Sequence, residues 1–321
     1  YFIILLFLIG DLLFQYIFEF NIFGFKPGLY NYNLEIYERY AGMFNQELVM
    51  GAFLSSIGLF SVFFYFTFNS SKKIILYFIL SLLFIGIFLT GERASILSFA
   101  ITTFFILFFC KEYRKNFIIL FIFFLTISSI GIYNSEQLKL RYIDYPLRVI
   151  SQNEGESENV WTKTDNFKVN LVEIPTQFME KTHWGAHYKT AFKMIETKPI
   201  NGYGFKQFRI KCRDYEYLFT EKFKLEANVY DGCSTHPHNY VLEILSEQGI
   251  IGFIIIFSII IISLRKSYNF NKNKIFWLVT FAILLGYLFP FKPTGSIFSS
   301  WFSAIFWFIL GFSFVRKKII K

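Results

Sequence analysis

Long apolar stretches are the feature that most limits how this chain can fold. Eight of them recur along its 321 residues, at about 1–20, 48–68, 74–90, 94–110, 116–133, 239–263, 275–290 and 297–315. A helix needs roughly 20 mostly apolar residues to cross the hydrocarbon core of a bilayer, and several of these stretches lie near the short limit. Apolar residues make up 54% of the chain and Phe alone contributes 46, more than a soluble fold of this size could bury. The sequence therefore predicts an all-α, polytopic transmembrane helix bundle with about eight helices.

The distribution of Lys and Arg predicts how this bundle is oriented. Loops on one side of the helices hold 13 of these residues in all, at 69–73, 111–115, 265–274 and 316–321. Loops on the other side hold four, at 21–47, 91–93 and 291–296. Because cytoplasmic loops carry the excess of positive charge, the C-terminus is expected in the cytoplasm.

The long segment 134–238 falls on the opposite, exported side. It holds 15 Lys and Arg against 14 Asp and Glu, so it is nearly neutral. The net charge of +9 thus comes mostly from the topology signal, and no nucleic-acid partner is expected.

Three segments follow from this map. Residues 1–133 would form transmembrane helices 1–5, residues 134–238 one large periplasmic loop, and residues 239–321 helices 6–8 with a cytoplasmic tail. Tyr1 opens the chain inside an apolar stretch, so we expect earlier helices to be missing.

One helix is predicted inside the exported segment, around Lys189–Glu196. Ala191, Phe192, Met194 and Ile195 have the spacing of an amphipathic helix, which Pro199 would end. It would lie at the membrane surface or pack as an ordinary loop helix.

All four histidines fall in the exported segment, at 183, 187, 236 and 238. Histidine has the unperturbed pKa best suited to proton transfer near neutral pH, so acid–base chemistry is expected on the outer side. His183 and His187 have the spacing of zinc ligands on a helix. They lack the adjacent Glu of metalloproteases and an obvious third ligand, so no metal site is predicted.

His238 stands just before the apolar stretch 239–263. Pro237 suits the first turn of a helix, whose free N–H groups would form an anion site. On a straight helix one face would carry His238, Leu242, Leu245, Gly249 and Gly252. The two glycines would then let another helix or a lipid tail approach closely. Equally, His238 could cap a helix that carries a packing pair of glycines.

Arg93 opens a helix at the outer boundary, after the turn Thr90–Gly91–Glu92. Its guanidinium could reach lipid headgroups there and match a phosphate bidentately. The alternative is an Arg that reaches the interface and pairs with its neighbour Glu92.

A glycine turn and a basic cluster follow one another later in the exported segment. Gly202 and Gly204 permit a tight turn in Pro199–Phe205, and Lys206, Arg209, Lys211 and Arg213 come directly after it. The cluster could bind a phosphate or form a solvated face. Cys212 and Cys233, 21 positions apart, could form a disulfide in an oxidising periplasm and tie this cluster to the turn before His236.

These stretches, taken in order, resemble the O-antigen ligase and O-antigen polymerase family of bacterial envelope glycosyltransferases. Residues 90–97 resemble its Gly–Ser–Arg segment, with Glu92 where Ser is usual, and Pro199–Gly204 resembles its Pro-x-x-Gly-x-Gly stretch. His238–Asn239, nine residues, Gly249, two residues and Gly252 match its His–Asn–Gly–Gly spacing. The segment Arg39–Phe44 is similar to the family's Arg-x-x-Gly-x-Phe opening of an exported loop, and residues 231–239 with Phe208–Arg209 and Cys212 look like one subgroup.

The resemblance implies a glycan donor on undecaprenyl diphosphate, with no metal or nucleotide cofactor. The family pattern marks the position of His238, to which we assign the general base, with inversion at the anomeric carbon as a hypothesis. Arg93 and Arg209 are our candidate catalytic cations beside the diphosphate. We expect further substrate contacts from residues in the same stretches, namely Arg39, Lys206, Arg213, His236, Asn239, Gly249 and Gly252.

Several functions remain open. The first is a ligase that moves the glycan onto lipid A–core, and the second is a polymerase that extends it on the lipid carrier; we favour the ligase. A flippase or transporter is a third, for which Asp11 and Gln15 are the only intramembrane polar candidates. A non-catalytic scaffold is a fourth. In the first two cases the protein would lie in the bacterial inner membrane with its active site facing the periplasm.

Overall fold

The fold was analysed in a computed structural model. It describes residues 2–32, 35–45, 47, 49–68, 73–109, 111–144, 146–147, 174–214, 232–270 and 274–314. The chain divides into two compact units. The first comprises residues 1–142, 263–289 and 305–321, and the second comprises residues 143–262 and 290–304.

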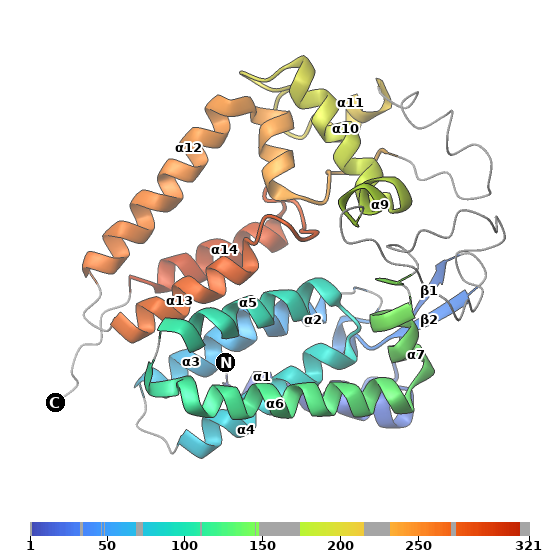
Figure 1. The fold of residues 1–321 in the computed structure, drawn as a ribbon, viewed down its shortest axis with the longest axis vertical. Coiled ribbons are helices and arrows are strands. Elements are labelled where there is room, and N and C mark those ends of the chain that lie inside the picture. The colour runs from blue at the N-terminus through green and yellow to red at the C-terminus, as the bar shows by residue number, and fades with distance from the viewer. Residues whose placement is uncertain are drawn as a thin grey trace. The chain divides into compact units, whose positions relative to one another are not determined.

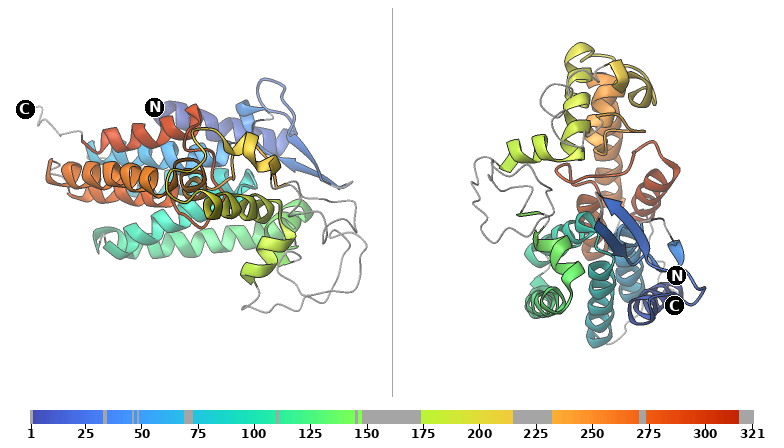
Figure 2. Two further views of the ribbon diagram at one scale, coloured as in Figure 1. Left: turned by 90° about the horizontal axis from the view of Figure 1, so that it is seen from above. Right: turned by 90° about the vertical axis from the view of Figure 1, so that its right-hand side faces the viewer.

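A helix lies at each of the eight apolar stretches, as predicted. In the first unit these are α1 (Phe2–Phe18), α2 and α3 (Met50–Phe53 and Leu59–Phe68, joined by the π-helical turn η2, Leu54–Gly58), α4 (Lys73–Leu89), α5 (Arg93–Phe109), α6 (Lys111–Asn134) and α13 (Lys274–Tyr287). α12 (Tyr240–Phe270) and α14 (Ser300–Phe312) each pass from the second unit into the first. Figures 1 and 2 show the helices of the first unit running side by side.

Small residues bring α5 and α13 together. Thr102 Oγ1 donates a hydrogen bond to the Ala282 carbonyl (3.2 Å). A Cβ atom added to Gly286 would lie 2.4 Å from Thr102 Oγ1 and 2.5 Å from the Ser98 carbonyl. Glycine at position 286 therefore permits the close approach of these two helices, a device common in membrane proteins.

A β-hairpin and a buried network of polar hydrogen bonds lie at one end of the first unit. Strands β1 (Gly28–Tyr32) and β2 (Glu35–Arg39) pair antiparallel, with Gly28 opposite Arg39. The turn η1 (Gly42–Phe44) follows, and Gln15 Oε1 accepts its Ala41 and Gly42 N–H groups (3.1 and 2.8 Å).

Asp11, also on α1, belongs to the same hydrogen-bond network. Its carboxylate accepts Asn21 Nδ2 (3.2 Å) and the Ile22 N–H (3.0 Å). Asp11 and Gln15 thus hold the chain that leaves α1, so neither gives particular support to a transport path.

The second unit is built on α9 (Ile174–Lys181), α10 (His183–Thr197), the short α11 (Phe208–Lys211) and the first arm of α12. The Thr182 side chain caps α10 by accepting the Gly185 N–H (2.9 Å). The predicted amphipathic helix is therefore present and begins earlier than expected. Ala191 and Met194 are fully buried in a core with Phe208, Cys212 and Leu242, which favours the packed-helix alternative, although Phe192 is 47% exposed.

α12 is not straight. Gly249 has φ 64° and ψ −169°, so the helix breaks there into two arms, Tyr240–Gln248 and the longer part after the glycine (Figure 1). The single face predicted for His238 through Gly252 is therefore wrong at both ends, because His238 precedes the helix and Gly249 breaks it; only Leu242 and Leu245 lie together on the first arm.

By length and apolar composition, one helix in the described part of the chain could cross a membrane alone, α12. The pair Ile118–Asn134 and Glu136–Asp144, bent by 116°, would add a second if it counts as one span. The other apolar helices have 10–17 residues. Many of their large apolar side chains are exposed, among them Ile119 at 59% on α6 and Ile254 at 57% on α12. Exposed apolar surface of this extent is typical of a membrane or protein interface.

Candidate active site

Predicted site residues fall in both units, and each group is described within its own unit. In the first unit, the turn Thr90–Gly91–Glu92 between α4 and α5 lies among arginines. Arg39 Nε donates to the Thr90 carbonyl (3.2 Å), and Arg141 Nε donates to the Gly91 carbonyl (2.9 Å).

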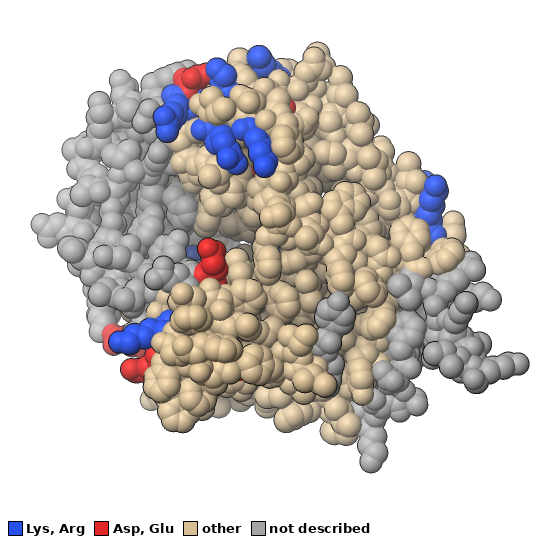
Figure 3. Space-filling model, turned by 180° about the vertical axis from the view of Figure 1, so that it is seen from behind, with Lys and Arg blue, Asp and Glu red and all other residues tan. Residues whose placement is uncertain are grey.

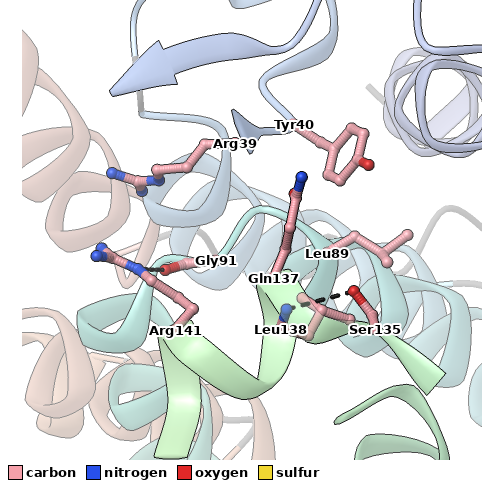
Figure 4. Close-up of a pocket in the computed structure, with 8 residues that line it drawn as sticks. All are labelled: Arg39, Tyr40, Leu89, Gly91, Ser135, Gln137, Leu138 and Arg141. Atoms are coloured by element: carbon pink, nitrogen blue, oxygen red, sulfur yellow. Dashed lines mark hydrogen bonds between the residues drawn. The ribbon is translucent and has the colours of Figure 1, made fainter. Parts of the chain in front are cut away.

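A small pocket opens beside this turn. Arg39, Tyr40, Leu89, Gly91, Ser135, Gln137, Leu138 and Arg141 line it. Figure 4 shows the guanidinium groups of Arg39 and Arg141 on the same side of the pocket, each beside the 90–92 turn. We call these residues the arginine pocket.

Arg93, the first residue of α5, belongs to the same positively charged region. Tyr142 stacks on Phe88 with ring centroids 4.9 Å apart and donates from Oη to the Phe88 carbonyl (2.7 Å). Burial raises the pKa of Tyr142, and the Glu92 charge acts in the same direction, while the charges of Arg141, Arg39 and Arg93 oppose them. Three guanidinium groups and one carboxylate therefore lie near this phenol ring.

Glu92 explains how the turn is held. Its carboxylate accepts the N–H groups of Gly51 (2.9 Å) and Ala52 (3.0 Å), at the start of α2, and the Ser95 hydroxyl (2.8 Å). It also pairs with Arg39 at 3.8 Å, both side chains being about nine-tenths buried. Burial raises the pKa of Glu92 despite Arg39 and these hydrogen bonds. The predicted alternative, a pair between Glu92 and Arg93, is replaced by this longer-range network.

Replacing Glu92 with alanine is expected to destabilise the first unit. Two N–H groups of α2 would lose their acceptor and the Arg39 guanidinium would lose its charge partner, at a cost of about 3 kcal/mol in the free energy of unfolding. A lower midpoint of thermal unfolding in detergent would show this. Glu196→Ala is the control, since Glu196 is an exposed partner of Lys193, and an equal loss in both variants would contradict the role of Glu92.

In the second unit, three of the four histidines come together. The ring centroid of His238 lies 4.2 Å from that of His236 and 5.2 Å from that of His187. Trp184 of α10 packs edge-on against His238 at 4.5 Å. We call these four residues the histidine cluster. Among the described residues no group of three or more His, Cys, Asp or Glu could hold a metal ion.

His238 is held in an uncommon backbone conformation. Its φ is 54°, in the left-handed region that non-glycine residues rarely adopt. The Thr294 N–H donates to the His238 carbonyl (2.8 Å) and so fixes it. Such strain is often found at functional sites, where surrounding bonds maintain it.

The helix after His238 starts later than predicted, at Tyr240. Asn239 caps it, because its Oδ1 accepts the N–H groups of Val241 (3.0 Å) and Leu242 (3.1 Å), while Thr294 Oγ1 accepts that of Tyr240 (3.0 Å). The anion site predicted from free N–H groups in this turn is therefore wrong, since the chain's own side chains fill it. Asn239 also donates from Nδ2 to the Pro290 carbonyl (2.6 Å), so its visible contacts are structural.

His236 is kept neutral. Burial lowers the pKa of His236 to about 4. A backbone hydrogen bond with Thr294 opposes this effect in part, and electrostatic interactions with His187 and Arg209 lower the pKa further. Its Nδ1 lies 2.9 Å from Thr235 Oγ1. Its buried Nε2 makes no hydrogen bond of good geometry with the described residues.

This pKa predicts how stability depends on pH. The unfolded chain binds the His236 proton below its ordinary pKa, near 6.5, and the folded chain only near 4, so protonation favours unfolding as pH falls between these values. Replacing His236 with glutamine is expected to reduce the loss of stability over that window. Melting curves from pH 7 to 4 would measure it, and parallel curves for the two proteins would contradict it.

The glycine turn Pro199–Gly204, which precedes the basic segment Lys206–Arg213, lies against the kink of α12. The Tyr203 and Gly204 N–H groups donate to the carbonyls of Ser246 (3.0 Å) and Glu247 (2.7 Å). A Cβ on Gly202 would lie 2.4 Å from the Glu247 backbone, and one on Gly249 2.1 Å from the Ile200 carbonyl. The two glycine motifs of the sequence therefore fit each other, and Gly249 serves this contact rather than the approach of another helix.

The basic segment Lys206–Arg213 places positive side chains on the surface of the second unit. Lys206, Arg209 and Arg213 are exposed, and Figure 3 shows Lys and Arg gathered over α10 and α11. Arg209 acts electrostatically on His236 and on Glu247, which places it near the histidine cluster. Cys212 and Cys233 form a disulfide with Cα atoms 5.2 Å apart.

Gly252, the last glycine of the predicted pattern, lies one turn beyond the kink. A Cβ there would meet Gln248 Cβ at 2.2 Å. Gly252 therefore makes room for the Gln248 side chain of the same helix.

Several residues of these sites were not predicted, among them Arg141 and His187. Arg141 was counted only among the charges of the exported segment, and its contact with Gly91 spans 50 positions. His187 was considered only with His183, whereas the structure packs it on His238, 51 positions away.

Comparison with known proteins bears on both sites. The family model described as O-antigen ligase matches residues 78–257, more than half of the chain. The chain belongs to the O-antigen ligase family. The matched region includes Arg93, Arg141, Arg209 and the whole histidine cluster, and Arg39 lies before it.

A protein of Rickettsia conorii is similar over part of its length. It is provisionally named a polysaccharide ligase and is 29% identical to this chain over 133 residues, which cover 41% of this chain and 30% of that protein. This chain thus matches less than a third of that relative. No solved structure matches the chain.

Proposed function

We propose that the protein is a membrane glycosyltransferase that moves a glycan from undecaprenyl diphosphate onto lipid A–core. The observation that carries this proposal is membership of the O-antigen ligase family over residues 78–257. The histidine cluster and the two groups of cations give this region groups suited to such a transfer.

In the proposed step, a hydroxyl of the acceptor attacks the anomeric carbon of the donor sugar. The new C–O bond forms as the bond between sugar and diphosphate breaks, and the electron pair leaves with the diphosphate. His238 takes the hydroxyl proton, and His236, kept neutral, helps to orient it. The donor arrives with its leaving group attached, so the step requires no nucleotide.

The departing diphosphate gains negative charge, which fixed cations stabilise. The candidate contacts in the first unit are Arg39 and Arg141 of the arginine pocket together with Arg93, and the separate candidates in the second unit are the exposed Lys206, Arg209 and Arg213. Arg is well suited because its planar fork binds phosphate oxygens in pairs.

The proposal places the chain in the bacterial inner membrane with several spans and these residues toward the periplasm. The exposed apolar side chains of α6 and α12 support it, since lipid would cover them. The charge distribution of the loops supports this orientation.

A polymerase that extends lipid-linked glycans is the second candidate, since it needs the same donor and the same base. Purified protein in proteoliposomes, given lipid-linked glycan with or without lipid A–core, separates the two. Glycan on lipid A–core is the result expected for the ligase. Longer lipid-linked chains made without lipid A–core would identify the polymerase, and no transfer under either condition would contradict both.

A further inference from the structure

Glu247 is a buried carboxylate to which the transfer step assigns no role. It lies on the first arm of α12, two residues before the kink, and is 1% exposed. Its Oε2 accepts the Lys206 N–H (2.7 Å), and its Oε1 accepts the Phe208 N–H (3.0 Å). Each oxygen of the carboxylate therefore binds one backbone N–H group of the basic segment.

These two hydrogen bonds hold a strained part of the chain. Lys206 has φ 56°, uncommon for a residue with a side chain. Phe208, which opens α11, is completely buried. Charge-assisted hydrogen bonds to a carboxylate are about twice as strong as neutral ones, so Glu247 is well placed to maintain this conformation.

Glu247 also completes a closed ring of contacts. The first arm of α12 runs from the cap at Asn239, next to His238, to Glu247. From Glu247 the hydrogen bonds lead to α11, then the Cys212–Cys233 disulfide leads back to the turn that carries His236. The ring contains the proposed base and the exposed cations of the basic segment.

We propose that Glu247 is a positioning residue, which fixes the cations of segment 206–213 where they bind the donor diphosphate. This inference rests on the proposed function, because it takes the diphosphate as the ligand of that segment. Glu247 itself touches neither substrate nor the reacting atoms.

The test compares Glu247→Gln with wild type and with Glu196→Gln. Glutamine keeps the shape, but its amide group would face one of the two N–H donors. We expect about tenfold weaker equilibrium binding of undecaprenyl diphosphate in nanodiscs and about a tenfold higher donor KM, with kcat within about twofold. Glu196→Gln is expected to match wild type, since Glu196 is exposed on α10 and its ion pair with Lys193 lies on the surface.

A merely structural role predicts a different result. A partly unfolded population would lower the apparent kcat and leave the donor KM unchanged, so that outcome would overturn the proposal, as would unchanged diphosphate binding. Hydrogen exchange of the peptide that contains the Lys206 and Phe208 amides gives an independent readout. It is expected to be about tenfold faster in Glu247→Gln, and unchanged exchange would also count against the proposal.

The disulfide offers a second variant, because it holds the same segment. Cys233→Ser together with Glu247→Gln is expected to weaken diphosphate binding by more than the product of the single effects. Effects that simply multiply would mean that the two links act on different parts of the site.

Failure of the proposed function is distinguishable from failure of this inference. Wild-type protein that binds undecaprenyl diphosphate in a Glu247-dependent way but transfers no glycan would refute the function and leave the positioning role. Normal transfer and normal binding in Glu247→Gln would refute the positioning role alone. Wild type that does not bind undecaprenyl diphosphate would refute both.

Discussion

Replacing His238 with alanine is expected to lower the rate of glycan transfer by about 10³-fold, within the range that general-base catalysis contributes. The acceptor hydroxyl would then lose the group that takes its proton. His238→Gln should lose as much activity, because an amide keeps a polar side chain but cannot serve as the base. Initial rates with saturating donor and acceptor would measure both.

The fold should survive these changes. His238 has a strained φ held by the Thr294 N–H, which binds its backbone rather than its ring. The thermal midpoint is therefore expected to stay near that of wild type, as in the control Lys193→Ala on the exposed side of α10. Transfer by His238→Gln at a rate close to wild type would exclude His238 as the base.

Replacing Gly249 with alanine is expected to have the largest effect on folding. Its φ of 64° with ψ −169° is a conformation nearly limited to glycine, which costs a residue with a Cβ about 1–3 kcal/mol. The added Cβ would also lie 2.1 Å from the Ile200 carbonyl oxygen, which is backbone and cannot rotate away. We expect a total loss of about 3 kcal/mol or more in stability, together with loss of transfer.

Gly10→Ala is the matched control. Gly10 lies inside α1, and a Cβ there would meet nothing within 4 Å. Alanine should leave stability unchanged or raise it slightly, since it favours helix over glycine. The yield of folded protein and the thermal midpoint would measure the stability of both variants. If Gly249→Ala were as stable as Gly10→Ala, the close contact between the two glycine motifs would be contradicted.

The helices were predictable from sequence because long apolar stretches have few ways to satisfy their backbone groups other than helix. A helix lies at each of the eight stretches, and α10 was found from the spacing of its apolar residues. These signals are local, so a reading of consecutive residues detects them.

The break in α12 was not predictable in the same way. Periodicity assumes a straight helix, and the reason for the break lies in the loop Pro199–Gly204, nearly fifty positions earlier. The Ile250 N–H, for example, donates to the Pro199 carbonyl (2.9 Å) instead of continuing the helix. Long-range partners of this kind leave no periodic pattern.

The sites show the same contrast. The His–Asn–Gly–Gly spacing pointed to His238, and the structure packs against it His236, also a sequence-based candidate, and His187, which was not one. For Glu92, a local pair with Arg93 was the expected alternative, whereas its partners are Arg39 and the start of α2. Arg141 carried no motif, so only its contact with Gly91 indicates a role.

The central claim is that a glycan leaves undecaprenyl diphosphate for an acceptor hydroxyl. Its most direct test follows a donor labelled in both sugar and lipid, in proteoliposomes that contain lipid A–core and either wild type or His238→Gln. The account predicts that wild type releases one undecaprenyl diphosphate for each glycan joined to the acceptor, and that His238→Gln releases almost none. Movement of intact donor between the leaflets without release of the carrier would contradict the account and favour transport.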